Sequence, residues 1–219
     1  MTVPVNLLRQ IERKLRLPTA NSAEWMDFGH WSPADLYQPL VRKFAQIREA
    51  QRDGATFAFT SISPGEGVSF VTAQIARELA QHAGEKVLVT TAESLHALAP
   101  VHLGEIEFGA QPGAKVWRLA HRQPAMDIQP LGFRMEALQI LRKRFGYVLV
   151  DCPALRESGA VIPAARASAG LILVVAAAET RRDHVEQAQS ALEDAGCHLL
   201  GLVLNKRREA VPKFLYPYF

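Results

Sequence analysis

The feature of this sequence that most constrains its fold is an alternation between short apolar runs and amphipathic helical patterns. The β-rich runs lie at 57–62, 86–91, 115–120, 147–151, 171–178 and 199–205. Helical patterns precede or separate them at 34–52, 70–84, 133–145, 157–168 and 181–196. Apolar strands must be covered on both faces, and helical connections between successive strands favour parallel pairing. We therefore predict an α/β fold with a mostly parallel central sheet flanked by helices, in which 92–114 is the least patterned stretch.

Charge separates the first residues from the rest of the chain. The formal net charge of the 219 residues is +3, and residues 1–17 carry all of it, because the remaining charges balance. A neutral body argues against a general nucleic-acid binder. Residues 5–17 place apolar side chains at helical spacing with basic ones between them, which predicts a short amphipathic helix. This helix either docks on the body or binds a partner or a membrane surface.

Composition suggests one main domain with short appendages. The 48% hydrophobic content supplies ample core material for a single domain. We predict a basic arm and linker over 1–33, a body over 34–210 and a tail over 211–219. No apolar run approaches the roughly 18 residues of a membrane-spanning helix, and the first residues lack a signal peptide's apolar stretch. We therefore expect a cytoplasmic chain in which Cys152 and Cys197 are ordinary buried thiols.

A glycine-rich loop follows the first predicted strand and opens the next helix. Glycines let backbone N–H groups approach a phosphate, and the helix dipole favours the anion. In an active P-loop a lysine follows the last glycine and reaches the terminal phosphates, and the next Ser or Thr holds magnesium. Here Val68 stands at the lysine position and Ser69 at the magnesium position. The predicted phosphate-binding residues are Ser63, Pro64, Gly65, Glu66, Gly67, Val68, Ser69 and Phe70.

The loop and its surroundings resemble a known family. The run TSISPGEGVSF, an Ala-rich helix and then KVLVTTAES resemble the cytoplasmic P-loop domain of bacterial tyrosine kinases of capsular and exopolysaccharide biosynthesis. Those domains are paired with membrane polysaccharide co-polymerases and belong with the septum-positioning and plasmid-partition ATPases. The resemblance covers about residues 34–206. It implies a three-layer P-loop NTPase-like fold that binds ATP or ADP with Mg²⁺.

Three of the family's site residues are kept. The resemblance places the magnesium-binding serine at Ser69, the Walker B aspartate at Asp151 and the adenine-contacting asparagine at Asn205. Each position also has a structural interpretation, because Ser69 could be an ordinary residue of the first helical turn. Asp151 could cap the turn after its strand, and Asn205 could simply end a strand.

Other family features are degraded. Val68 replaces the lysine, and the second acidic motif falls on Thr91 and Glu93, with a threonine in place of the first aspartate. A second lysine, which some relatives carry earlier in the loop, falls on Ser63. The family's ring-forming Glu-x-x-Arg-x-x-Arg pattern falls on Asp35, Gln38 and Val41, so neither arginine is kept. The family's tyrosine-rich tail is reduced to two tyrosines, Tyr216 and Tyr218. Arg181 and Arg182 either reach a phosphate or start a surface helix.

The joint erosion favours a catalytically impaired, pseudokinase-like protein that regulates or scaffolds exopolysaccharide biosynthesis and export. Its expected partners are the cytoplasmic tail of a co-polymerase, a kinase paralogue or a second copy of itself, and no nucleic acid. We expect it at the inner face of the plasma membrane. One alternative is an active ATP-binding tyrosine kinase or ATPase with a remodelled P-loop and residual catalytic residues Asp151, Thr91 and Glu93. Another is a membrane-surface positioning protein of the partition-ATPase type.

Overall fold

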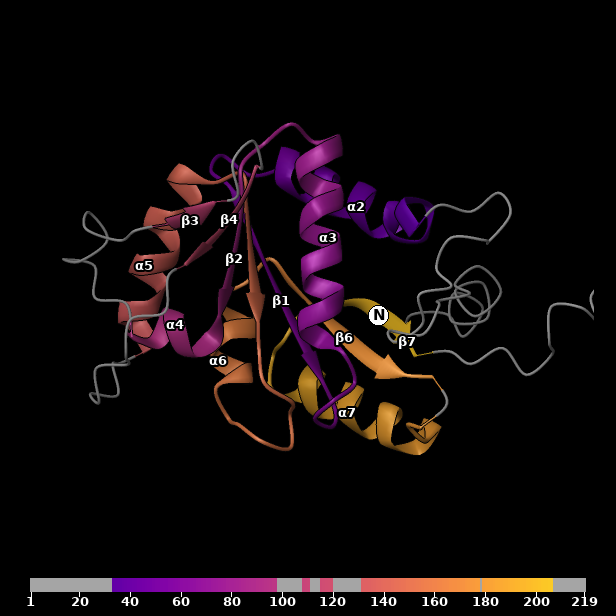
Figure 1. Ribbon diagram of the computed structural model, residues 1–219. Helices are drawn as coiled ribbons and strands as arrows, with labels where there is room; N and C mark the ends of the chain where they lie inside the picture. The colour runs from indigo at the N-terminus through magenta and orange to yellow at the C-terminus, as the bar shows by residue number, and fades with distance from the viewer. Residues whose placement is uncertain (1–32, 98–107, 111–114, 120–130, 178, 207–219) are drawn as a thin grey trace, which may run out of the picture.

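A computed structural model describes residues 33–97, 108–110, 115–119, 131–177 and 179–206 (Figure 1). The predicted helix over 5–17 and the tail residues Tyr216 and Tyr218 lie outside this part of the chain, and the predicted domain boundaries stay predictions. The described elements are α2 (Pro33–Glu49), β1 (Ala55–Ser61), α3 (Val68–His82), β2 (Val87–Thr91), α4 (Ala92–Ala97), β3 (Phe108–Ala110), β4 (Val116–Leu119), α5 (Leu131–Arg144), β5 (Tyr147–Asp151), α6 (Val161–Arg166), β6 (Gly170–Ala176), α7 (Arg182–Asp194) and β7 (Leu199–Asn205).

The strands form a single sheet in the order β3-β4-β2-β5-β1-β6-β7. Every neighbouring pair is parallel except β3 with β4. The predicted mostly parallel α/β architecture is therefore confirmed. The parallel order brings the carboxyl ends of β1, β2, β5, β6 and β7 to one edge of the sheet, which is where ligands bind in open α/β folds. This edge lies at the bottom of the view in Figure 1.

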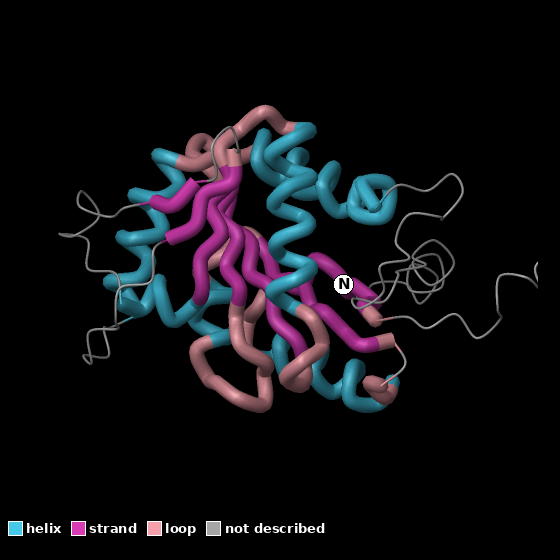
Figure 2. Tube along the Cα trace, in the orientation of Figure 1, coloured by secondary structure: helices cyan, strands magenta, loops and turns pink. Residues whose placement is uncertain are grey.

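Helices cover both faces of the sheet (Figure 2). On one face α2 and α3 pack on the sheet through fully buried side chains such as Phe44, Ile75 and Leu79. The Phe44 ring stacks on Phe57 of β1, with ring centroids 3.7 Å apart. On the other face α4, α5, α6 and α7 enclose a second core that includes Leu138. Burying a large apolar side chain of this kind contributes about 2–3 kcal/mol, so the helices hold the strands from both sides.

Some boundaries differ from those predicted. The helix predicted over 157–168 begins only at Val161, because the preceding residues form turns in which the Glu157 N–H donates to the Ala154 carbonyl at 2.9 Å. The sequence pattern also missed α4 and β3, which lie in the least patterned stretch. Within the described residues, no helix combines the length and apolarity that crossing a membrane requires.

Candidate functional site

The predicted phosphate loop connects β1 to α3 at the carboxyl edge of the sheet. β1 is buried along its whole length, and α3 starts at Val68. Gly65 and Gly67 have φ values of 83° and 93°, which favour glycine. A Cβ on Gly67 would lie 2.1 Å from Asn205 Nδ2, so a larger residue does not fit there. The sequence therefore builds a glycine turn into a helix N-terminus, whose first N–H groups have no partner within the helix.

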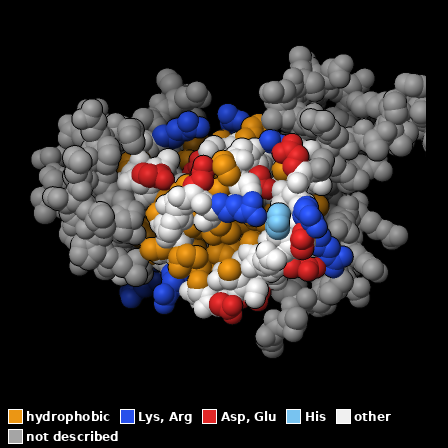
Figure 3. All heavy atoms as spheres, turned by 90° about the horizontal axis from the view of Figure 1, so that it is seen from below, with side chains coloured by type: hydrophobic (Ala, Val, Ile, Leu, Met, Phe, Trp, Pro, Cys, Tyr) orange, Lys and Arg blue, Asp and Glu red, His pale blue; other side chains and the backbone are white. Residues whose placement is uncertain are grey.

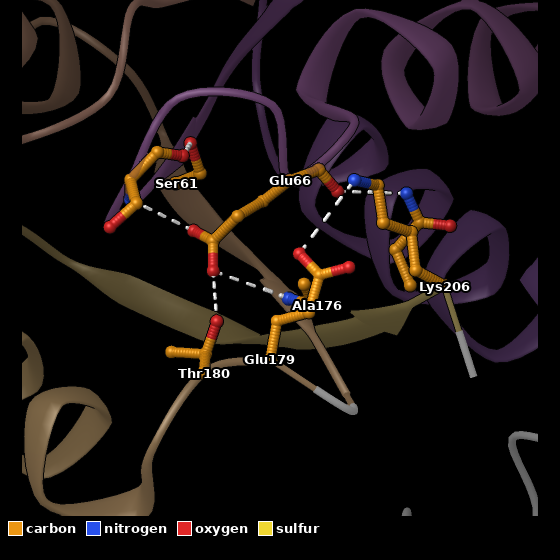
Figure 4. Close-up of polar contacts among 8 residues, drawn as sticks. Ser61, Glu66, Ala176, Glu179, Thr180 and Lys206 are labelled. Atoms are coloured by element: carbon orange, nitrogen blue, oxygen red, sulfur yellow. Dashed lines mark hydrogen bonds and ion pairs between the residues drawn. The ribbon is translucent and has the colours of Figure 1, made fainter. Parts of the chain in front are cut away.

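A buried carboxylate holds this loop in place (Figure 4). The Glu66 side chain is 4% exposed, and its Oε2 accepts hydrogen bonds from the N–H groups of Ile62 (2.8 Å) and Ser63 (3.0 Å). Its Oε1 accepts from the Ala176 N–H at 3.3 Å and from the Thr180 hydroxyl. The loop is thereby fastened to the end of β6. Sequence reasoning had included Glu66 only as one residue of the phosphate cradle.

The end of β7 fastens the same loop from a second side. Asn205 is 3% exposed, and its Nδ2 donates to the Glu66 carbonyl at 2.8 Å. Beside it, Lys206 adopts a φ of 55° and its Nζ lies 3.9 Å from Glu179 Oε2 (Figure 4). Asn205 thus braces the P-loop in this structure. Its predicted contact with adenine stays a prediction.

A pocket of about 410 Å³ opens between the P-loop and the ends of β2 and β5. It brings together most of the residues that the sequence singled out. Its lining residues are Ser61, Pro64, Gly65, Gly67, Val68, Ser69, Phe70, Thr91, Glu93, Asp151, Cys152, Pro153, Ala154 and Glu157. The predicted residues at the ends of β2 and β5 therefore converge with the P-loop on one site, whereas the predicted Ser63, Glu66 and Asn205 do not line this pocket.

Ser69 and Asp151 face each other in this pocket. Burial raises the pKa of the Asp151 carboxyl above its ordinary value of 3.8, and the nearby Glu93 carboxylate raises it further. A hydrogen bond from Ser69 and the positive charge of Arg118 act on this pKa in the opposite direction. A hydroxyl beside a carboxylate at the end of a strand suits Mg²⁺, which takes few protein ligands and completes its shell with water and phosphate oxygens.

Thr91 has a structural task. Its hydroxyl oxygen accepts a hydrogen bond from the Ser94 N–H at 3.1 Å, and its O–H group donates to the Ser94 hydroxyl oxygen. Since α4 begins at Ala92, this is the geometry of a helix N-cap. The threonine at the family's first acidic position therefore stabilises α4, while Glu93 keeps a carboxylate at the pocket. The spacing Thr-x-x-Ser was the available sequence signal for this cap.

The missing lysine is not replaced within the pocket itself. Val68 is 9% exposed and belongs to the apolar core under α3. Among the described residues, the pocket lining contains the carboxylates of Glu93, Asp151 and Glu157 and neither Lys nor Arg. The backbone cradle and the metal-binding side thus fit a magnesium-bound phosphate, whereas the position of the terminal-phosphate cation does not.

Arg181 and Arg182 lie at the start of a surface helix, which is one of the two alternatives that the sequence left open. Arg181 Nε lies 3.2 Å from Asp183 Oδ1, and Arg182 Nε lies 2.9 Å from Glu186 Oε1. The arginine side chains are 76% and 81% exposed. Both therefore sit on the surface at the start of α7.

The two α2 positions at which the family carries its ring-forming arginines make contacts within this chain. Val41 is 4% exposed and packs in the core between α2 and the sheet. Gln38 is partly exposed, and its Nε2 lies 2.9 Å from His82 Nε2 of the same chain. An arginine at position 41 would therefore enter the core in this packing.

The two cysteines are buried, as predicted. Cys152 lines the pocket, and burial together with the neighbouring Asp151 raises the pKa of its thiol. A thiol held in its protonated form is a poor nucleophile. Cys152 therefore contributes packing beside the Walker B position.

Comparison with known proteins identifies relatives along most of the chain. No protein-family model matches the sequence. The tyrosine-protein kinase CpsD of Streptococcus agalactiae serotype III (strain NEM316) is 27% identical over 197 residues, covering 77% of this chain and 81% of that protein. The kinase of the same name from Streptococcus pneumoniae is 28% identical over 186 residues, covering 71% and 77%. These matches confirm the resemblance inferred from the sequence.

Solved structures agree with this fold. The VpsO kinase domain has a TM-score of 0.64 at 21% identity, covering 80% of this chain and 94% of that one. The kinase domain of Escherichia coli Etk has a TM-score of 0.65 at 16% identity, covering 97% and 90%. The septum site-determining protein MinD of Pyrococcus horikoshii, solved with Mg-ADP, has a TM-score of 0.53 at 19% identity, covering 74% and 75%. At these identities the likeness establishes the P-loop NTPase-like fold.

Proposed function

Taking the chain as a homologue of the bacterial tyrosine-protein kinases, we propose that it is a catalytically impaired member of that group. Its role would be that of a regulatory or scaffolding subunit in exopolysaccharide biosynthesis and export. The observation that carries the proposal is Val68, which puts an apolar side chain into the core where an active P-loop has its lysine.

The chemical cost of this substitution is large. In phosphoryl transfer the lysine neutralises charge that develops on the terminal phosphates. Removing one such preorganised group typically slows the chemical step about 100–1000-fold. The helix-capping role of Thr91 and the buried position of Val41 support the same conclusion, because the second acidic motif and the ring-forming helix are altered together with the loop.

The proposed partner is the cytoplasmic tail of a membrane polysaccharide co-polymerase, with a kinase paralogue or a second copy of this chain as further candidates. This places the protein in the cytoplasm, at the inner face of the plasma membrane. Support comes from the resemblance across residues 34–206 and from a core that is kept intact while the chemistry is eroded.

An autophosphorylation assay on the full chain tests the proposal. We expect no phosphotyrosine with Mg-ATP, and we expect none from V68K, because a lysine alone leaves Thr91 and the α2 positions unchanged. A CpsD kinase serves as the positive control, and added CpsD tests whether the chain is a substrate or a regulator of a true kinase. Robust autophosphorylation by the wild type or by V68K would show that the other changes are harmless and would refute the impairment.

A working ATPase or kinase with a remodelled loop is the second candidate. The pairing of Ser69 with Asp151 favours it, because this pair retains the donors of a magnesium site. Binding of Mg-ATP tighter than about 100 μM, abolished by D151A, together with measurable turnover would support this candidate.

A membrane-surface positioning protein is a third candidate, favoured by the fold shared with MinD. It predicts liposome co-sedimentation that is lost when residues 1–17 are deleted. Sedimentation that survives the deletion would exclude the basic arm as the membrane anchor.

A further inference from the structure

The segment after β5 lies against the P-loop because the two backbones are hydrogen-bonded. The N–H of Leu155 donates to the Ser61 carbonyl at 2.8 Å, and that of Arg156 donates to the Ile62 carbonyl at 3.4 Å. The parallel pairing of β1 with β5 therefore has a continuation beyond Asp151. This continuation fixes the backbone of Arg156 next to the start of the P-loop.

The Arg156 side chain reaches the loop itself. Its Nη1 donates to Ser63 Oγ at 3.4 Å. Pro64 and Glu157, the chain neighbours of Ser63 and Arg156, both line the pocket, so this contact is made one residue away from the pocket lining on each side. Arg156 is exposed, and among the described residues no carboxylate forms an ion pair with it.

Other basic residues at this end of the molecule have acidic neighbours. Arg182 pairs with Glu186 at 2.9 Å, and Lys206 with Glu179 at 3.9 Å. Arg118 acts on Asp151, whose pKa it lowers. Figure 3 shows this end of the molecule, where basic and acidic side chains surround an apolar centre. Arg156 differs from the other three in being hydrogen-bonded to the P-loop.

The charge of the pocket lining favours such a cation beside an anionic ligand. Three carboxylates line the pocket, and a polyphosphate would be repelled by them. A guanidinium presents forked N–H donors that match phosphate oxygens. We propose that Arg156 supplies the cation for a magnesium-bound nucleoside polyphosphate on this P-loop, in the place that Val68 leaves without charge. The inference rests on the proposed function, since it names the ligand class that the impaired site retains.

Calorimetric titration of the full chain with Mg-ATP and Mg-ADP tests this role. R156A should weaken binding about 10- to 100-fold, as expected for loss of a charge-assisted contact. R156K should recover part of the affinity, because it restores the charge without the fork. R182A is the matched control: it removes an exposed arginine from the same end of the protein and should change affinity by no more than about twofold. Circular dichroism melts confirm that each variant is folded.

Three outcomes would overturn the assignment. The first is a wild-type chain that binds neither nucleotide at millimolar concentration, which would leave the scaffolding proposal standing. The second is an equal loss of affinity in R156A and R182A, which would show that the effect comes from the net charge of the protein. The third is a loss of affinity in R118A with none in R156A, which would identify Arg118, near Asp151, as the cation that binds the ligand. Autophosphorylation by the wild type would refute the proposed impairment, and the affinity of R156A would still decide the role of Arg156.

Discussion

At the scale of single residues, the P-loop keeps the groups that give it shape and lacks the group that gives it charge. Hydrogen bonds of Glu66 and Asn205 connect the loop to the ends of β6 and β7, and Gly67 permits the close contact with Asn205. Val68, one residue further on, packs into the core. Loop shape and loop chemistry are therefore separable here. A protein that serves as a scaffold needs only the first.

Replacing Glu66 with glutamine tests how much the shape depends on this carboxylate. Both oxygens of Glu66 accept hydrogen bonds, and the amide NH₂ of a glutamine would face donors such as the Ile62 N–H or the Thr180 hydroxyl. We expect E66Q to lower the free energy of unfolding by about 1–3 kcal/mol, the cost of leaving buried polar groups unsatisfied. Urea denaturation measures it.

The exposed Glu157 offers a matched control for the same carboxylate-to-amide change. E157Q should alter the free energy of unfolding by less than about 0.5 kcal/mol. If E66Q and E157Q unfold at the same urea concentration, the carboxylate network does not hold the loop.

Prediction of site residues from the sequence succeeded where a general rule of parallel sheets fixes where a residue lies in the fold. Ser69 lies in the first turn of the helix after one strand and Asp151 ends another strand, so the carboxyl edge of a parallel sheet brings them together. The partners of Glu66 could not be predicted, because Ala176 and Thr180 lie more than a hundred residues away and no local pattern marks them. The position of Arg156 was missed for the same reason.

At the scale of elements, prediction worked best for strands buried on both faces. The limits of β7 match the predicted 199–205, because the run LLGLVLN is apolar up to Asn205. Short elements failed, since α4 spans six residues and β3 three, too few to show a period. The helix predicted after β5 began too early, because the backbone there pairs with β1 and forms turns before α6.

Helix α2 also shows how packing can exclude an interface. Val41 lies in the core between α2 and the sheet, while Gln38 on the same helix is partly exposed. Introducing the family's arginine as V41R should lower the free energy of unfolding by about 3–5 kcal/mol, because it leaves an uncompensated buried charge. Q38R, at the partly exposed position, should cost less than about 1 kcal/mol.

Thermal and urea unfolding of V41R and Q38R, combined with size-exclusion chromatography, check this expectation. A V41R protein as stable as the wild type would mean that α2 repacks and can present this position outward. Ring-sized particles from a variant that carries both Q38R and V41R would then show that the helix can form the oligomer contact.

At the scale of the whole molecule, the site reduces the stability of the fold that carries it. Burial and the Glu93 carboxylate both raise the pKa of Asp151, so ionising this group in the folded state costs free energy. The Ser69 hydrogen bond and Arg118 offset part of that cost. A fold freed from binding magnesium would gain stability by losing this carboxylate, and its retention beside Ser69 supports a pocket that still holds a ligand.

The pH dependence of stability tests this cost, with D151N as the comparison. Because the folded-state pKa lies above the ordinary 3.8, the folded protein keeps a proton that the unfolded chain has already released. The contribution of Asp151 to the free energy of unfolding therefore falls as pH rises from 3.8 through the folded-state pKa, and it stays low at neutral pH.

An asparagine at position 151 does not ionise, and its amide oxygen can still accept a hydrogen bond from Ser69. Without magnesium, D151N should therefore melt above the wild type at pH 7, and the difference should vanish toward pH 3.8. All other carboxyl groups titrate in both proteins, so the difference isolates Asp151. A difference in melting temperature that does not change with pH, or a D151N protein that melts below the wild type at pH 7, would show that the Asp151 charge is well compensated in the fold.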